Sequence, residues 1–331
     1  MPNPIPYHKK FDKLTEDEQK LLEINKKSIE EFVEQSVSIS DTDHATRNAH
    51  AKTYAVVKGN FSTTTDFPEE LQQLFNEKQW DIMVRFSNAH LKITKKDIPA
   101  YGLALKIMQQ DGSTIANYPL VNFPLFPINS VSIFLKLFTS INKIFTKKWW
   151  YVFPFITQSL KIVPYFFTFS FFKSVLKLMR KRNDFILSFD YHSVGVYRLG
   201  NNMIKLKVVP KGIDPHFGKD LKVKEAIEKY LSSNDYNAEV FVQICYDLKD
   251  QPINVLNVEW QNSPFIKIGN IKIEKNALLD PHSCENEMLS FNPYESLTEF
   301  QPVGKIQKLR NEAYKISLET RNKINKLLKS K

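Results

Sequence analysis

The sequence predicts an α+β fold in which helices surround one antiparallel β-barrel or sheet. Apolar and polar residues alternate, as they do in half-buried strands, in several stretches between residues 51 and 275. Helical spacing of apolar residues marks the two ends, over residues 15–36 and 305–328. No run rich in Pro, Gly or Ser separates these regions, so we expect one domain.

Four helices are expected from the spacing of apolar residues. The first covers residues 15–36 and starts at Thr15, which Glu18 follows at the spacing of a capping box. The others cover residues 66–77, 222–233 and 305–328. Helices between and around strands are typical of a barrel with a helical coat.

The expected strands are bounded by residues that favour turns. Residues 51–63 form the first strand, which we expect to break at Gly59-Asn60, and residues 81–87 form the second. A hairpin is expected within residues 102–123, with its turn at Asp111-Gly112. Further strand patterns occupy residues 194–210 with a turn at Gly200-Asn201, residues 238–248, and a short strand pair at 265–275.

The composition narrows the class of protein. The chain has 331 residues, enough to bury a large core, and its two cysteines, Cys245 and Cys284, do not make a disulfide framework. Because no apolar signal lies near the N-terminus, we expect a reducing, cytoplasmic environment. A net charge of +10 is typical of proteins that bind nucleic acid or anionic membranes. Only 9 glycines are present, which argues against a Gly-rich phosphate loop.

Residues 149–172 form an unusual apolar stretch with one charge, Lys161, and two prolines. Its length matches the roughly 20 residues of a membrane span. Basic residues flank it on both sides: Lys147, Lys148, Lys173, Lys177, Arg180, Lys181 and Arg182. Three interpretations stay open, namely a buried pair of helices, an element lying in a membrane interface, and a span. The aromatics are massed together instead of alternating with the cations, so nucleic-acid binding is not expected.

Two groups of residues have the chemistry of a site. Arg47 precedes His50 by three residues just before a strand, and no two of the seven histidines have the spacing of a metal pair. In the last helix Arg310, Tyr314 and Arg321 are spaced by four and seven, so their side chains share one stripe. The stripe is either a half-buried tyrosine between solvated cations or a phenolate held by guanidinium groups, which would bind a metal.

In chain order, these residues and several strand segments resemble the catalase superfamily. The resemblance rests on R-x-x-H at 47–50, VRFS at 84–87, and R-x-x-x-Y followed by an arginine seven residues on, at 310–321. Other similar segments are YGLALKI (101–107), VFVQICYDL (240–248), WQNSPFIKIGNIKI (260–273) and LSFNP (289–293). It covers roughly residues 44–324 and is nearest to the short bacterial catalase-related proteins, which lack the extended C-terminal part of full-size catalases.

The resemblance implies an eight-stranded antiparallel barrel that binds haem b, with a C-terminal helix that carries the proximal ligand. Residues 1–43 would be an N-terminal helical arm and residues 44–331 the haem barrel domain. Tyr314 would be the axial ligand of the haem iron, and His50 the distal acid–base group. The remaining roles implied are Ser87 orienting the imidazole, Arg310 contacting the phenolate, and Arg47, Arg85 and Arg321 binding the propionates.

The sequence departs from the family pattern in three places. The segment that should carry the distal asparagine is one residue shorter, and we expect Asn122 to take that role. Asn48 and Ala49 stand where the family usually has valines, which implies a wider distal pocket. An apolar, basic-flanked insertion at about 133–185 has no clear counterpart in the family. It lies where the family has the wall of its haem-access channel, so we expect an apolar substrate.

We therefore expect a haem-dependent, peroxide-cleaving oxidoreductase that acts on organic or fatty-acid hydroperoxides. Three alternatives stay open: a hydrogen peroxide catalase, a fatty-acid hydroperoxide isomerase similar to allene oxide synthase, and a non-catalytic haem- or lipid-binding protein at a membrane surface. Residues 149–182 are expected to attach the cytoplasmic protein to the inner face of an anionic membrane. The sequence leaves homo-oligomerisation and the electron donor open.

Overall fold

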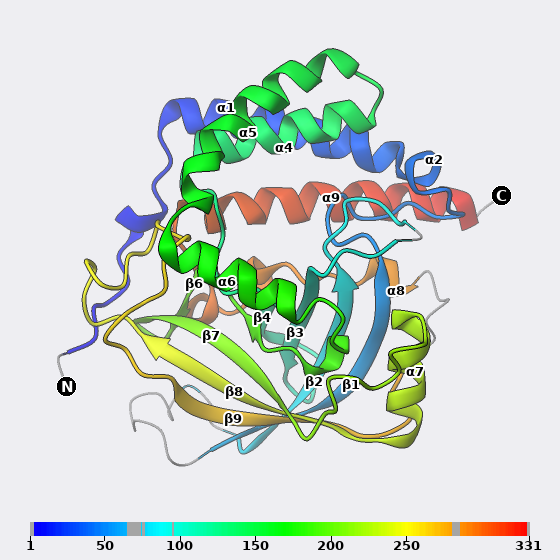
Figure 1. Ribbon diagram of the computed structural model, residues 1–331, viewed down its shortest axis with the longest axis vertical. Coiled ribbons are helices and arrows are strands. Elements are labelled where there is room, and N and C mark those ends of the chain that lie inside the picture. Colours follow the sequence, from blue (N-terminus) through cyan, green and yellow to red (C-terminus); the bar gives the residue numbers. More distant parts are fainter. Residues whose placement is uncertain (1–2, 65–73, 75–76, 95, 280–284, 330–331) are drawn as a thin grey trace.

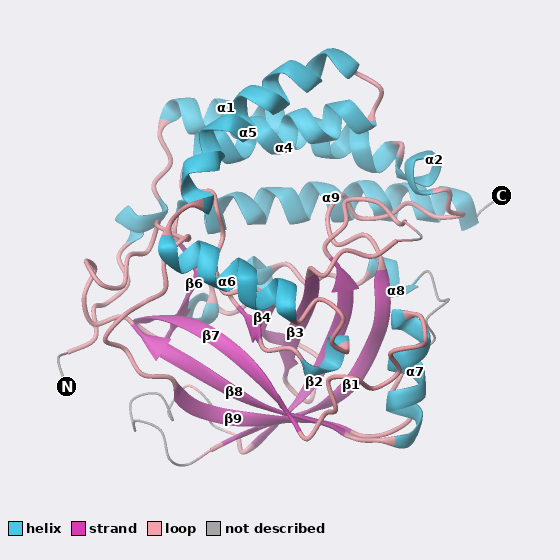
Figure 2. Ribbon diagram, viewed as in Figure 1, coloured by secondary structure: helices cyan, strands magenta, loops and turns pink. Residues whose placement is uncertain are grey.

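The computed structural model describes residues 3–64, 74, 77–94, 96–279 and 285–329. Within them the chain forms a β-barrel with helices stacked along one side (Figures 1 and 2). Eight antiparallel strands close the barrel in the order β7-β5-β4-β3-β2-β1-β9-β8, and β8 pairs back with β7. The expected antiparallel eight-stranded barrel is therefore confirmed.

The barrel strands differ widely in length. They are β1 (Thr53–Thr63), β2 (Gln79–Asn88), β3 (Tyr101–Met108), β4 (Thr114–Val121), β5 (Tyr191–His192), β7 (Asn202–Lys211), β8 (Tyr236–Ile244) and β9 (Ile266–Ile273). Two short strands, β6 (Val196–Leu199) and β10 (Pro302–Val303), continue the sheet beyond β7. The turns expected between β3 and β4 and between β6 and β7 are confirmed, with Gly112 and Gly200 at φ values of 83° and 63°.

Two glycines that were expected to interrupt strands do not. β1 runs through Gly59 without a break, and β9 is one strand, not a pair, although Gly269 lies near its centre. Both glycines lie where β1 meets β9. A Cβ atom on Gly59 would stand 2.5 Å from the carbonyl oxygen of Lys272, and one on Gly269 would meet the ring of Phe61. The glycines allow two strands to approach closely, and they are not turn residues.

The two faces of β2 and β3 carry different side chains. Alternate residues of both strands pack into the barrel core: Ile82, Val84, Phe86, Leu103, Leu105 and Ile107. Arg85, Ser87 and Gly102 lie between them in the sequence and so point away from this core. The polar face of these two strands is where the candidate site lies.

Three long helices form the coat beside the barrel (Figure 1). α1 (Glu16–Glu34) begins with the expected Thr15–Glu18 capping box and packs on α4 (Val131–Phe145) and α9 (Lys305–Lys329). α7 (Val223–Ser233) packs on β1. The shorter elements are α2 (Ser36–Ser40), α8 (Glu285–Met288) and the 3₁₀ turns Lys9–Asp12, Trp149–Tyr151, Ile186–Ser188, Pro293–Glu295 and Thr298–Phe300. Most of the helix expected at 66–77 lies outside the described residues.

The apolar insertion forms two further helices, α5 (Val152–Phe166) and α6 (Phe169–Arg180). α5 lies on α4, and α6 crosses in front of the barrel strands (Figure 1). Only Gln158 and Ile162 of α5 and Phe171 and Ser174 of α6 are buried, so the interpretation of a buried helix pair is wrong. No single described helix has the length and hydropathy of a membrane span. The segments Trp149–Phe166 and Phe169–Arg180 have the length and hydropathy of a span only when they are taken together, and a 95° bend separates them.

Candidate functional site

Three arginines from distant parts of the chain meet around one glutamate. Arg47 pairs with the carboxylate of Glu287 on α8, and it also donates to the carbonyl oxygen of Leu289 at 2.9 Å. Arg321 on α9 donates to the carbonyl oxygen of Glu287 at 3.2 Å. Arg85 on β2 donates through Nε to Thr53 Oγ1 at 3.0 Å, and Thr53 Oγ1 in turn donates to Glu287. All four charged side chains are buried.

The charges in this cluster do not balance. Burial and the neighbouring Arg47 lower the pKa of Arg85 to about 9, and burial lowers that of Arg321 well below its usual value. Burial acts to raise the pKa of Glu287, but the three arginines outweigh it and the pKa is lowered. One carboxylate against three guanidinium groups leaves two positive charges in this described part of the protein. A buried surplus of this size is unfavourable unless an anion offsets it.

The second part of the site is the tyrosine of α9. Arg310 donates to the hydroxyl of Tyr314 through Nη2 at 3.1 Å, and through Nη1 to Gln307 at 2.8 Å and to Tyr197 at 3.3 Å. Burial acts to lower the pKa of Arg310, but Tyr314 and Tyr197 outweigh it and raise that pKa. Tyr314 is half-buried, and its oxygen is held by a cation one helical turn away, as the spacing predicted.

The third part of the site is His50, which lies on the loop before β1, three residues after Arg47. Its Nδ1 atom is hydrogen-bonded to Ser87 Oγ at 3.2 Å. The ring lies against Gly102 of β3, where a Cβ atom would stand 2.6 Å from Nδ1 and 2.8 Å from Ser87 Oγ. Gly102 is therefore required for the imidazole and the serine to lie side by side.

The backbone and the charge of His50 are both constrained. Its φ is 50°, in the left-handed region that few residues other than glycine adopt, and Arg85 donates to its carbonyl oxygen at 2.6 Å. Burial, followed by the charges of Arg85 and Arg310, lowers the pKa of His50 to about 3. The imidazole is therefore neutral near pH 7, with a ring nitrogen able to accept a proton.

Asn122 lies just after β4, beside the strand pair that carries Gly102. Its Oδ1 accepts from the backbone nitrogen of Tyr101 at 2.8 Å, and its Nδ2 donates to the carbonyl oxygen of Pro99 at 3.2 Å. No hydrogen bond within the described residues joins it to His50. Its role as the distal amide stays a prediction.

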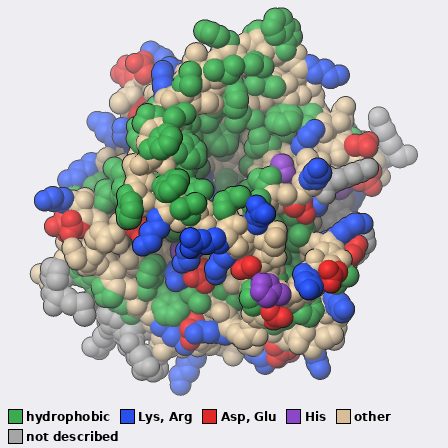
Figure 3. All heavy atoms as spheres, in the orientation of Figure 1, with side chains coloured by type: hydrophobic (Ala, Val, Ile, Leu, Met, Phe, Trp, Pro, Cys, Tyr) green, Lys and Arg blue, Asp and Glu red, His purple; other side chains and the backbone are tan. Residues whose placement is uncertain are grey.

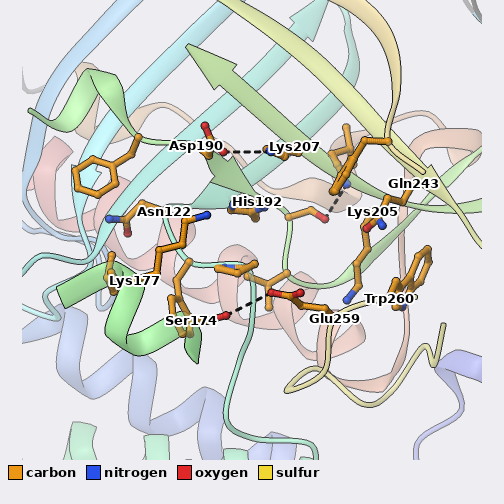
Figure 4. A pocket seen from close by; sticks show the side chains of 18 of the residues that line it. Asn122, Ser174, Lys177, Asp190, His192, Lys205, Lys207, Gln243, Glu259 and Trp260 are labelled. Atoms are coloured by element: carbon orange, nitrogen blue, oxygen red, sulfur yellow. Dashed lines mark hydrogen bonds and ion pairs between the residues drawn. The ribbon is translucent and has the colours of Figure 1, made fainter. Parts of the chain in front are cut away.

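Asn122 also lines a cavity of about 320 Å³ between α6 and the barrel (Figure 4). It is lined by Lys177 of α6, by Lys181 just after that helix, and by Lys205 and Lys207 of β7, together with His192, Glu259 and Trp260. Burial lowers the pKa of Lys205 to about 8 and that of His192 to about 4. The cavity is therefore a second cation-rich space, separate from the arginine cluster.

Three solved structures share the arrangement of barrel and helices. A fungal catalase aligns with a TM-score of 0.59 and 15% identity, over 84% of this chain and 59% of its own. Catalase A from Saccharomyces cerevisiae gives 0.59 and 14%, over 97% and 67%. A bacterial catalase gives 0.60 and 16%, over 84% and 58%.

The chain has a catalase-like fold. It spans less than two thirds of the fungal and bacterial catalases, and at 14–16% identity the likeness concerns the fold alone. No family model and no curated protein matches the sequence.

Within this catalase-like fold, all the expected site residues except Asn122 are in contact with other residues of the site. The structure brings His50 to Ser87 and Tyr314 to Arg310, and it gathers Arg47, Arg85 and Arg321 around Glu287. Sequence reasoning missed Glu287, Gly102, Thr53, Gln307 and Tyr197. Glu287 has one local signal, because it precedes the LSFNP segment of the resemblance, but only the fold shows which cations it meets.

The described residues fit the haem that the sequence leads us to expect. Haem carries two propionates, and the arginine cluster has two uncompensated positive charges. A phenol next to a guanidinium has the chemistry of an axial iron ligand. Arg47, Arg85 and Arg321 would hold the propionates, and Tyr314 would bind the iron.

Proposed function

We propose that this chain is a haem-dependent oxidoreductase that cleaves the O–O bond of a peroxide. One observation supports it most: three buried arginines have a single carboxylate, and a fourth arginine holds the hydroxyl of Tyr314. A barrel that only bound lipid would need neither feature. Bound haem would supply the redox-active iron for the cleavage, and a second peroxide or an organic donor would supply the two electrons that return it to its resting state.

On the proximal side, where Tyr314 would bind the iron, the residues of α9 would hold the ligand in place. Arg310 donates a hydrogen bond to the hydroxyl oxygen of Tyr314 at 3.1 Å, and so fixes the oxygen that would bind the iron. Gln307 and Tyr197 fix the guanidinium from the other side. A tyrosine ligand would donate electron density to the iron and support its oxidised states.

On the distal side His50 moves a proton. Its neutral ring takes the proton of the hydroperoxide and returns it to the leaving oxygen, which departs as an alcohol, or as water when the substrate is hydrogen peroxide. Ser87 keeps the ring in one orientation, and Arg85 holds the backbone of His50 in its left-handed conformation. In this proposal Asn122 hydrogen-bonds the distal oxygen.

We further propose organic or fatty-acid hydroperoxides as the substrate class. Ala49, next to His50, is small and exposed, so the distal side has room for an alkyl group. Each buried CH₂ contributes about 0.8 kcal/mol, so a few methylenes outweigh a preference for the smallest peroxide. Hydrogen peroxide is the competing substrate.

The first test is the absorption spectrum of protein purified from haem-supplemented cells. Wild type should carry a ferric haem spectrum, and Tyr314→Phe should lose haem or change that spectrum. Tyr165→Phe on α5 is the matched control, because Tyr165 is half-buried but distant in sequence from the site. A colourless wild type, or a Tyr314→Phe spectrum identical to wild type, overturns the assignment.

The second test is steady-state kinetics on one haem-loaded preparation with both substrates. We expect a higher kcat/KM for a fatty-acid hydroperoxide than for hydrogen peroxide. Product analysis separates reduction to an alcohol from isomerisation to an epoxide. Rapid oxygen release from hydrogen peroxide, with no turnover of the fatty-acid hydroperoxide, would identify a hydrogen peroxide catalase instead.

A further inference from the structure

Thirteen of the twenty-two exposed large hydrophobic side chains in the described residues belong to one short segment of the chain. We call them the outer ridge: Trp149, Trp150, Val152, Phe153, Ile156, Leu160, Val163, Phe166, Phe167, Phe169, Phe172, Leu176 and Met179. Phe169 is 81% exposed and Trp149 is 75% exposed. In Figure 3 hydrophobic side chains gather over the upper part of the molecule, where Figure 1 shows α4 and α5. A patch of this size marks an interaction site.

The outer ridge follows the helical period, so it is a face and not a scatter of residues. On α6, residues 169, 172, 176 and 179 share one stripe, while the buried Phe171 and Ser174 lie on the opposite side. On α5, residues 152, 156, 160 and 163 share a stripe that faces away from the buried Gln158 and Ile162. Each helix thus has a buried side that attaches it to the protein and an exposed apolar side that the described residues leave uncovered.

The charge of the protein is concentrated in the same segment. Between Asp111 and Asp184 the sequence contains 10 Lys and Arg residues and no Asp or Glu. The rest of the chain has 36 cations and 36 anions, so this segment accounts for the whole net charge of +10. A local charge of this size attracts an anionic surface.

The cations of α6 and of the turn after it stand beside the outer ridge and have no carboxylate partner among the described residues. No ion pair in the described part of the chain involves any of the following side chains, all of which are exposed: Lys173, Lys177, Arg180, Lys181 and Arg182. On the helical wheel Lys173, Lys177 and Arg180 lie between the exposed apolar stripe of α6 and its buried side. This order, apolar stripe then cations, is the order that acyl chains and lipid headgroups present at a bilayer surface.

We propose that the outer ridge of α5 and α6 docks on the surface of an anionic lipid bilayer. The occupant follows from charge complementarity. Of the ten cations in the acid-free segment, only Lys143 and Lys148 form ion pairs among the described residues, both with Glu31, so eight are left to match anionic headgroups. A second copy of the same face would instead place like charges together. The aromatic and aliphatic side chains enter the boundary between headgroups and acyl chains, to a depth of roughly 5–10 Å, and the cations stay at the headgroups. The inference rests on the surface alone and does not require the proposed function.

Docking would bring the membrane next to the cation-rich cavity. The inner side of α6 supplies Ser174, Lys177 and Leu178 to that cavity, while its outer side carries part of the ridge. One helix therefore separates the bilayer from the space in which Lys205 and His192 lie. A substrate or product that leaves the bilayer would meet this cavity first.

The test is co-sedimentation of the full-length protein with vesicles. Wild type should sediment with vesicles of phosphatidylcholine and phosphatidylglycerol, much less with pure phosphatidylcholine, and should be released by salt. Each basic residue near an anionic surface is worth about 1 kcal/mol, or roughly fivefold in partitioning, so Lys173→Gln/Arg180→Gln/Arg182→Gln should weaken binding about 100-fold. A matched control, Lys27→Gln/Lys219→Gln/Lys249→Gln, removes the same charge from exposed sites elsewhere and should bind nearly as wild type.

A second variant separates burial from charge. Phe153→Ser/Phe167→Ser/Phe169→Ser removes three rings that are at least 74% exposed, so the fold should be kept while binding to both vesicle types falls. The control is Leu221→Ser/Leu248→Ser/Leu297→Ser, which removes three exposed hydrophobic side chains that lie outside the ridge and should leave vesicle binding unchanged. Far-UV circular dichroism and thermal unfolding verify the fold of each variant.

Tryptophan fluorescence gives an independent measure of depth. Of the four tryptophans, Trp80 and Trp260 are buried, at 3% and 5% exposure, and Trp149 and Trp150 are exposed on the ridge. Vesicles should therefore shift the emission to shorter wavelength, and brominated lipids should quench it through Trp149 and Trp150. Trp149→Leu/Trp150→Leu should remove both signals.

Three results of the vesicle experiment would overturn the proposal, and a fourth would assign the ridge to another partner. The first is that the Lys173/Arg180/Arg182 variant and the Phe153/Phe167/Phe169 variant both bind vesicles as well as wild type does. The second is that binding of wild type does not depend on lipid charge or on salt. The third is wild type that cannot be released by high salt or carbonate, which would show a broken membrane span. If wild type ignores vesicles but self-associates, and the phenylalanine variant does not, then the ridge is an interface between copies of the chain.

Discussion

The arginine cluster and the cations beside the outer ridge are both groups of positive side chains, but their environments differ. In the cluster, buried guanidinium groups are fixed by carbonyl oxygens, hydroxyls and Glu287, and burial lowers the pKa of Arg85 and Arg321. Beside the outer ridge, the five cations of α6 and of the turn after it are exposed and form no ion pair within the described residues. The first arrangement selects a ligand by geometry, and the second attracts a surface by net charge.

The difference also predicts where mutations will have effects. Removing a buried charge leaves its partners uncompensated in a medium of low dielectric constant, which costs several kcal/mol. Removing an exposed charge changes little inside the protein, since water already solvates it. Functional effects should follow the same division, with chemistry in the cluster and partner binding on the ridge.

The largest effect is expected at His50. His50→Ala should lower peroxide turnover per haem by about 10²–10⁴-fold, because general acid–base help is lost, while haem content stays nearly unchanged. Ser87→Ala keeps the imidazole but frees its orientation, and should lower the rate by a smaller factor. Single-turnover kinetics on preparations of known haem content provide the measurement. Equal rates for wild type and His50→Ala would make His50 a structural residue.

Glu287 tests the charge balance of the cluster directly. Glu287→Gln should destabilise the haem-free protein by about 3–5 kcal/mol, because three buried cations lose their shared carboxylate. The loss should be smaller in the haem-loaded protein, where propionates supply negative charge. Urea unfolding of both forms measures the difference.

The matched control for Glu287 is Glu239→Gln. Glu239 pairs with Lys211 and Lys267 on the barrel surface, so the expected loss there is only about 0–1 kcal/mol. Equal losses for the two variants would show that the arginine cluster carries no special surplus of charge. Equal losses with and without haem would show that haem does not neutralise it.

The sequence predicted the strands and the helix termini because local patterns specify them, while the closed eight-stranded barrel was predicted from the resemblance to catalases. Alternation marks β2 and β3, the Thr15–Glu18 capping box starts α1, and one helical stripe joins Arg310 to Tyr314. It failed where distant segments meet. Gly59 and Gly269 look like turn residues locally, but their role is the close approach of β1 and β9. The role of Glu287 depends on Arg47, which lies 240 residues away in the chain.

A smaller effect is expected in the pH dependence of stability. Burial lowers the pKa of native His50 to about 3 from a usual value of 6.5, so between these values the unfolded chain binds a proton that the native chain does not. Stability must then fall as the pH drops from about 6.5, by up to about 1.4 kcal/mol per pH unit for this group. Haem-free His50→Gln should lose that share of the slope in urea unfolding at several pH values. An unchanged slope would place the imidazole in contact with water.

The smallest effect is expected on the outer ridge, and it completes the comparison. Arg180→Gln should change the free energy of unfolding by no more than about 0.5 kcal/mol, because Arg180 is exposed and has no ion pair among the described residues. Arg85→Gln, in the cluster, removes a cation that bridges Thr53 and the His50 carbonyl oxygen, and should both destabilise the protein and weaken haem binding. Adding anionic vesicles should raise the melting temperature of wild type more than that of Arg180→Gln, since a surface that binds only the native state stabilises it by mass action. If Arg180→Gln instead destabilised the protein as much as Arg85→Gln, the cations of the ridge would be structural, and the distinction between a geometric site and an electrostatic surface would fail.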